Sequence, residues 1–98
     1  MPVYMMVEIM EIRDPETYRS YIEKVKELVV QQGGKYLSRG SNITPISGDW
    51  TPKRMILIEF PSMESVQNCF NSLQYREIAP LREKATLSRA IIIEGTID

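Results

Sequence analysis

The spacing of apolar and polar residues changes from strand-like to helix-like within the first thirty positions of the chain. Val3 to Ile12 is apolar and rich in strand-forming residues, which predicts a first strand. Asp14 can cap free helix amides, and Pro15 suits the first helical position. Apolar side chains then recur at helical spacing on one face, at Tyr18, Tyr21, Ile22, Val25, Leu28 and Val29. Gly33-Gly34 is expected to end this helix.

The middle of the chain predicts two strands joined by a turn. The expected parts are a second strand over Tyr36 to Arg39 that resumes through Ile43 and Ile46 after a bulge near Gly40-Ser41, a turn over Gly48 to Pro52, and a third strand over Arg54 to Phe60. If this turn sets the pairing register, Arg39 lies opposite the end of the third strand, beside Glu59.

The last third of the chain predicts helical segments and a final strand. Ser62 is the expected cap of a helix whose buried face carries Val66, Cys69, Phe70 and Leu73. After a break near Asn71-Ser72, Tyr75 to Ala85 is helical, with Pro80 as the site of a kink or a fresh turn. Ala90 to Glu94 is the last strand.

The resulting order of elements is βαββαβ over residues 1–98, expected to form a single domain. This order predicts an α+β, ferredoxin-like fold with a four-stranded antiparallel sheet in the order 4-1-3-2 and both helices on one face. The other face would expose apolar side chains, namely Tyr4, Met6, Met10, Met55, Leu57 and Ile92. An apolar sheet face of this kind marks an interface, so we expect a homodimer packed sheet against sheet.

The balance of charged residues argues against two classes of binding partner, nucleic acids and membranes. Twelve Lys and Arg residues stand against 13 Asp and Glu, a net charge of −1, so no electric field gathers nucleic acid or an anionic membrane. No apolar run reaches the roughly 18 residues that a membrane span needs. The N-terminus lacks a basic leader and meets Glu8 and Glu11, which favours a strand over a signal peptide, and a cytoplasmic location is expected.

The chain contains no histidine and one cysteine, Cys69. Catalytic systems built on histidine, histidine-ligated haem and the usual zinc sites therefore lack their residues, and no metal or cofactor is expected. Any chemistry has to use carboxylates, tyrosine, arginine, lysine or a bound cofactor. Cys69 lies on an apolar helix face and is expected in the core.

Several motifs in a fixed order resemble one family of short, mainly bacterial proteins. They are DPETYRSY, GGKYLSRG, SGDWTPKRMILIEFPS, SLQYREIAPLR and IIIEG, and they cover nearly the whole chain. With these motifs the chain resembles the family called domain of unknown function 1330, of the dimeric α/β-barrel superfamily. The resemblance implies a ferredoxin-like protomer, a two-fold dimer with facing sheets, and no established activity.

Arg39 and Glu59 are the first candidate site residues. An ion pair between them would be a structural device, or the two would line a ligand site, since a guanidinium suits a carboxylate or a phosphate. Glu59 and Glu94 end strands that flank the first strand, roughly 10 Å apart, too far to share a proton. A paired-carboxylate acid and base site is therefore not expected.

Four further residues are candidates for ligand binding. Tyr75 and Arg82 would line a cleft between the second helical region and the sheet. Trp50, on the predicted turn, either packs at the barrel end or partner subunit, or stacks on a ligand. Tyr18 packs on the helix face with its hydroxyl at the rim, or serves a ligand.

Two function classes stay open at this point. The first is a small-molecule binder or cofactor-independent enzyme with a pocket between helices and sheet, by analogy with relatives on the dimeric barrel. The second is a non-catalytic dimeric structural or accessory module. RNA recognition on the sheet is disfavoured, because Tyr4, Tyr36 and Phe60 have acidic neighbours rather than a basic surface.

Overall fold

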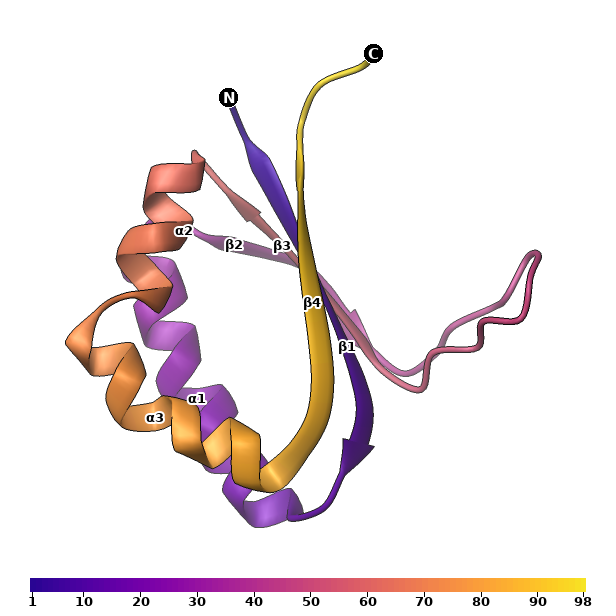
Figure 1. The fold of residues 1–98 in the computed structure, drawn as a ribbon, viewed down its shortest axis with the longest axis horizontal. Helices are drawn as coiled ribbons and strands as arrows, with labels where there is room; N and C mark the ends of the chain where they lie inside the picture. Colours follow the sequence, from indigo (N-terminus) through magenta and orange to yellow (C-terminus); the bar gives the residue numbers. More distant parts are fainter.

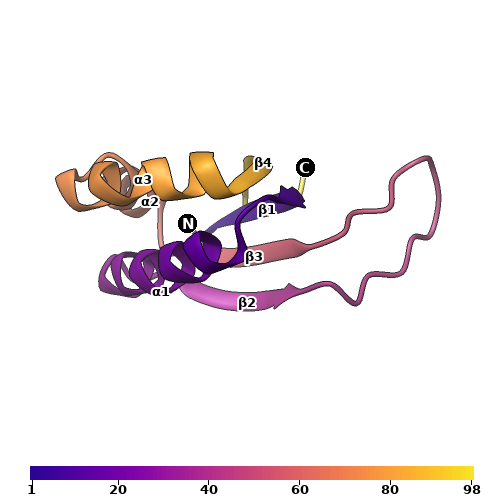
Figure 2. The same cartoon turned by 90° about the horizontal axis from the view of Figure 1, so that it is seen from below.

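The computed structural model describes residues 1–98 and shows four strands and three helices (Figure 1). In chain order they are β1 (Val3–Ile12), α1 (Pro15–Gln31), β2 (Lys35–Gly40), β3 (Met55–Phe60), α2 (Met63–Phe70), α3 (Leu73–Ala85) and β4 (Thr86–Glu94). The strands form one antiparallel sheet in the order β2-β3-β1-β4. All three helices cover the same face of this sheet (Figure 2). The predicted α+β, ferredoxin-like fold and strand order are therefore confirmed.

Local hydrogen bonds explain both ends of α1. Asp14 accepts the backbone N–H of Thr17 at 3.2 Å and the Thr17 hydroxyl at 2.7 Å. These bonds to Thr17 lower the pKa of the Asp14 carboxyl. At the other end the N–H of Gly34 bonds to the carbonyl of Val29 at 2.8 Å, after Gly33 at a φ of 81°. Glycine adopts this left-handed conformation without a Cβ clash, so the helix ends where the sequence predicted.

The second helical region divides at Asn71-Ser72, as expected. The Ser72 hydroxyl donates to the carbonyl of Cys69 at 2.7 Å and accepts the N–H of Tyr75 at 3.1 Å, so one side chain ends α2 and caps α3. Pro80 lies inside α3. The expectation that Leu73 joins the buried face of α2 was wrong: Leu73 is 71% exposed. Leu73 follows the cap and belongs to the first turn of α3, so the helical spacing of α2 no longer determines which way its side chain points.

The core lies between the sheet and the helices. Val29 of α1, Phe60 of β3 and Cys69 of α2 are its most completely buried large side chains. Burial raises the pKa of the Cys69 thiol to about 11, because the thiolate would lose its hydration there. The prediction that Cys69 is a core residue is confirmed.

Residues 41–54 form an irregular arm between β2 and β3. The arm extends away from the helix layer, on the open side of the sheet (Figures 1 and 2). The predicted continuation of the second strand through Ile43 and Ile46 was wrong, and Ile46 is 91% exposed. A connection of this length does not fix the pairing of its flanking strands as a two-residue hairpin turn would.

A bulge in β2 sets which side chains face the helices. Tyr36 pairs with Ile58 and Ser38 pairs with Leu57, which leaves Leu37 as an extra residue. The predicted bulge near Gly40-Ser41 was therefore displaced: it lies at Leu37. Because of this extra residue, Arg39 pairs with Ile56 and faces the helices, on the same side as Tyr36.

β4 begins four residues earlier than predicted, at Thr86. Ile92 pairs with Met5, whose side chain packs on the helix side of the sheet, so its assignment to the open face was wrong. Ile91 and Ile93 take that place and are 64% and 57% exposed. Three consecutive isoleucines offer no alternation, so the pattern alone could not say which of them points to which face.

Candidate functional site

A cavity of about 350 Å³ lies between the sheet and helices α1 and α3. Of its 20 lining residues, 16 are hydrophobic, and the lining draws on all three helices and all four strands. The sheet contributes the helix-facing positions of β1 and β3, such as Val7 and Ile56, and α1 contributes its apolar face. Cavities of this size, at the small end of roughly 300–1,000 Å³, hold small ligands.

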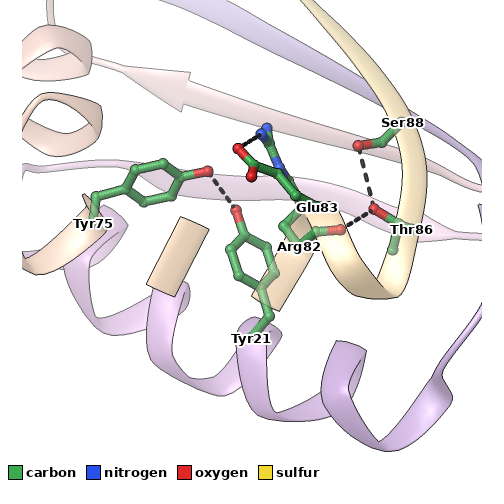
Figure 3. A network of polar contacts seen from close by, with 6 residues as sticks. All are labelled: Tyr21, Tyr75, Arg82, Glu83, Thr86 and Ser88. Carbon is green, nitrogen blue, oxygen red and sulfur yellow. Dashed lines mark hydrogen bonds and ion pairs between the residues drawn. The ribbon is translucent and has the colours of Figure 1, made fainter. Parts of the chain in front are cut away.

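Two tyrosine hydroxyls meet inside this cavity. The hydroxyl oxygens of Tyr21 on α1 and Tyr75 on α3 are 2.9 Å apart, and their rings meet edge to face at a centroid distance of 6.3 Å (Figure 3). Phe70 also packs edge to face against the Tyr75 ring, at a centroid distance of 4.9 Å. Burial, and then the proximity of Tyr75, raises the pKa of Tyr21 far above its ordinary value. Both hydroxyls can exchange hydrogen bonds with a ligand, but Tyr21 stays protonated.

Three arginines and one serine are the other polar residues of the cavity lining. Arg82 lies 3.8 Å from Glu83, and Arg89 lies 2.7 Å from Glu8 on the open side of the sheet. Arg39 makes no ion pair; its guanidinium lies over the ring of Tyr36, 5.4 Å from the centroid. No aspartate or glutamate lines the cavity. Its polar groups are thus cationic or neutral.

The junction of α3 and β4 is held by a hydrogen bond to the backbone of Arg82. The Thr86 hydroxyl donates to the carbonyl of Arg82 at 2.9 Å and lies 3.4 Å from the Ser88 hydroxyl (Figure 3). Thr86 is itself buried. This junction fixes the last turn of α3 against the start of β4, and Arg82 and Ser88, on either side of it, both line the cavity.

Tyr18 closes the end of the cavity nearest the arm. Its ring is 7% exposed and packs with Ile9 and Ala85. Its hydroxyl accepts a hydrogen bond from Nε of Arg54 at 3.2 Å, where the arm enters β3. The expectation of a packed ring with a hydroxyl at the rim agrees with this placement.

The open face of the sheet carries a second, shallower hollow. It is lined by Met6, Glu8, Trp50, Met55, Arg89, Ala90 and Ile91. Glu8 is only 9% exposed, and its two carboxylate oxygens accept from Arg89 and from the indole N–H of Trp50. Trp50 therefore rests on its own sheet and is half exposed.

The predicted pairing of Arg39 with Glu59 was wrong. Glu59 pairs with Tyr4 of β1 and Lys35 of β2, and it points to the open face, whereas Arg39 faces the cavity. On that face the Glu59 carboxylate raises the pKa of Tyr4, through hydrogen bonding first and charge second. The pairing register differs from the one that the turn predicted, since Lys35 and not Arg39 lies opposite Glu59, and the bulge at Leu37 then turns Arg39 to the helix side.

Of the six residues singled out from the sequence, four come together at the cavity and two do not. Tyr18, Arg39, Tyr75 and Arg82 line it, while Trp50 and Glu59 belong to the other side of the sheet. Tyr21 was not among the six, since its position on the apolar helix face favoured packing over catalysis, and no role was predicted for Glu8 or Arg89. The predicted last strand began at Ala90, one residue after Arg89, so no partner in the sheet was predicted for Arg89.

A model of one protein family matches the sequence of this chain. The model called domain of unknown function 1330 matches residues 2–96. The chain belongs to this family. The resemblance found in the sequence motifs is thereby confirmed, and the family description itself carries no activity.

Solved structures of similar fold cover nearly all of the chain. A protein of unknown function from Rhodopseudomonas palustris is 21% identical, with a TM-score of 0.78 over 99% of this chain and 84% of that one. A dimeric ferredoxin-like protein of unknown function from Jannaschia sp. is 9% identical, with a TM-score of 0.75 over 96% and 99%. SnoaB of Streptomyces nogalater, a cofactor-independent oxygenase, is 8% identical, with a TM-score of 0.69 over 99% and 95%. At these identities the likeness establishes the fold alone.

Comparison with functionally curated proteins gives no match. None of the three helices has the length and apolar character needed to cross a bilayer. No three acidic or thiol side chains gather as metal ligands would. The expectation of a protein without resident metal stays a prediction.

Proposed function

We propose that this chain is a homodimeric protein that binds one small apolar molecule in the cavity between its helices and its sheet. The observation that carries the proposal is the cavity of about 350 Å³, largely hydrophobic, into which the paired hydroxyls of Tyr21 and Tyr75 project. A core that served stability alone would be packed to the density of an organic crystal, and so large a void costs stability.

The polar groups support binding more than acid and base catalysis. A general base at neutral pH is usually a histidine or a carboxylate, and the lining contains neither. The raised pKa of Tyr21 makes its hydroxyl a poor acid and leaves no phenolate at neutral pH to act as a base. A reaction like that of a cofactor-independent oxygenase would have to start from a substrate that ionises on its own, with arginine stabilising the anion. SnoaB is the reason to test for this reaction.

The homodimer part of the proposal rests on the open face of the sheet. Its exposed apolar residues include Ile91 and Ile93, and the arm with Ile46 projects from the same side. Covering such a face is favourable by about 25 cal/mol for each Å² of apolar surface removed from water. A second copy of the chain supplies an identical apolar face, and the neighbour from Jannaschia sp. is described as dimeric.

A neutral fluorescent probe tests the binding site. Phenylnaphthylamine should bind saturably to the folded protein and raise its melting temperature, because a ligand that binds only the folded state stabilises it. Ile22→Trp fills the cavity from α1 and should abolish this binding. Val30→Trp is the matched control on the exposed side of the same helix and should leave binding unchanged.

Three results would overturn the proposal. One is the absence of saturable binding by any of a panel of small apolar compounds. The second is equal loss of binding in the Ile22→Trp and Val30→Trp variants, which would place the probe elsewhere. The third is binding that persists in Ile22→Trp but is lost when Ile91 is changed. The probe would then bind on the open face of the sheet and not in the cavity.

A further inference from the structure

The charges around the cavity do not cancel. Arg82 and Arg89 each have a carboxylate partner, Glu83 and Glu8, and both partners lie outside the cavity lining. Arg39 has none. The cavity therefore offers an unpaired guanidinium and no competing anion to an incoming molecule.

The bulge in β2 places this guanidinium at the cavity. Side chains of a regular strand alternate, so Tyr36 and Arg39, three positions apart, would point to opposite faces. The extra residue Leu37 puts both on the helix side, where they line the same cavity. Bulges often re-aim a side chain in this way near binding sites.

The ring of Tyr36 holds the guanidinium in a defined position. Arg39 lies over it at 5.4 Å from the ring centroid, a cation–π arrangement that limits the rotamers of the long side chain. The residue itself is exposed, so its charge stays hydrated until a ligand arrives. An arginine so held needs little further ordering to form a two-pronged hydrogen bond with a planar anion.

We propose that the ligand of this cavity is an apolar molecule with one acid group, a carboxylate or a phosphate, and that Arg39 binds that group at the cavity mouth. This inference rests on the proposed function and specifies the class of ligand. The apolar body occupies the space between α1 and the sheet, beside Tyr21 and Tyr75. Arg82 also lines the cavity, and its guanidinium lies 3.8 Å from Glu83.

Three matched probes test the acid group. Naphthoate, its neutral methyl ester and naphthyl phosphate share one aromatic body, and calorimetric titration gives the affinity of each. We expect naphthoate or naphthyl phosphate to bind at least about tenfold more tightly than the ester, as a charged hydrogen bond would give. Whichever of the two binds more tightly identifies the acid group.

Variants separate the role of Arg39 from net charge. Arg39→Gln should remove the preference for the acid while the affinity for the ester is kept, and Arg39→Lys should keep part of it. Arg76→Gln removes the same charge from the exposed side of α3 and should change nothing. Raised salt should weaken acid binding in the wild type and not ester binding.

The outcomes distinguish this inference from the proposed function. Equal binding of acid and ester, or a preference that persists in Arg39→Gln, would overturn the inference and leave the binding cavity standing. Failure of all three probes to bind would overturn both. Loss of binding to all probes in Arg39→Gln, with an unchanged melting temperature, would also contradict an acid-specific role.

Discussion

The indole nitrogen of Trp50 donates a hydrogen bond to Oε2 of Glu8 across 3.3 Å, and so joins the arm to a strand 42 positions earlier in the chain. The other carboxylate oxygen of Glu8 accepts from Nε of Arg89 at 2.7 Å. A carboxylate that is nearly buried on a sheet face is stable only with such partners. The pair thus anchors the arm to its own protomer on the face we assign to the dimer.

Glu8→Gln should destabilise the protein by about 1 to 3 kcal/mol, because Arg89 and Trp50 lose a charged acceptor. Urea unfolding measures this. Glu11→Gln is the matched control, since Glu11 pairs with Arg13 on an exposed part of the same strand and should change stability by less than about 0.5 kcal/mol. Trp50 is the only tryptophan, so acrylamide quenching of its fluorescence should increase in Glu8→Gln alone. Unchanged quenching would mean that Glu8 does not hold the arm.

The Tyr21 and Tyr75 hydroxyls should behave as a coupled pair. Tyr21→Phe and Tyr75→Phe each leave one hydroxyl without its partner, at a cost of about 1 kcal/mol. The double change should cost less than the sum, since no orphaned hydroxyl remains. Unfolding by urea of the four proteins gives the coupling energy, and strict additivity would argue against the 2.9 Å contact.

Cys69 should make the protein less stable in alkali. Its pKa is raised from 9.0 in the unfolded chain to about 11 in the folded protein, so the folded state holds the thiol proton more tightly. Its contribution is complete below about pH 9 and is lost as the pH rises through about 11, by roughly 2 kcal/mol. Between about pH 8 and pH 11 the free energy of unfolding should therefore fall more for the wild type than for Cys69→Ala. The void that the alanine leaves lowers the stability of the variant equally at every pH and does not affect this comparison. Parallel curves for the two proteins would refute a buried, protonated thiol.

The homodimer should depend on the open sheet face. Light scattering should give twice the chain mass of 11.3 kDa for the wild type. Ile91→Lys, on that face, should shift the protein toward monomer, whereas Leu73→Lys, an equally exposed leucine on α3, should not. A wild type that stays monomeric at micromolar concentration would contradict the proposal.

Arg39 and Glu59 should be energetically independent. They face opposite sides of the sheet, so Arg39→Met and Glu59→Gln should add within about 0.5 kcal/mol when combined. A double-mutant cycle in urea measures the sum. A coupling above about 1 kcal/mol would restore the ion pair that the sequence alone suggested.

The sequence predicted the fold where the determining signals are local. The helix ends are marked by residues that bond to partners three to five positions away, namely Asp14, Gly33-Gly34, Ser62 and Ser72. The first three mark the ends that the sequence predicted, and Ser72 lies at the predicted break. The strand order followed from the order of elements. These predictions required no knowledge of which residues meet across the sheet.

The site was less predictable because it depends on register. A bulge of one residue at Leu37 decides where Arg39 points, and nothing in the local composition of KYLSRG marks Leu37 as the extra residue. Likewise the run of isoleucines at positions 91–93 gives no alternation. Tyr18 and Arg82 were found because helical spacing indicates their face, and Tyr75 because it lies in the same helical region as Arg82. Glu8 and Arg89 meet only through the pairing of β1 with β4.

The anchored Trp50 divides the arm into two stretches of different tolerance to changes in length. Gly40 pairs with Met55 at the base, so the sheet does not depend on how many residues lie between them. Doubling a flexible loop adds only about 0.6 kcal/mol of closure entropy, so residues inserted between Ser41 and Gly48 should be accommodated. Inserted residues between Trp50 and Met55 would instead draw the indole off Glu8. The first stretch is therefore the place to graft a peptide tag or a reporter sequence into this protein.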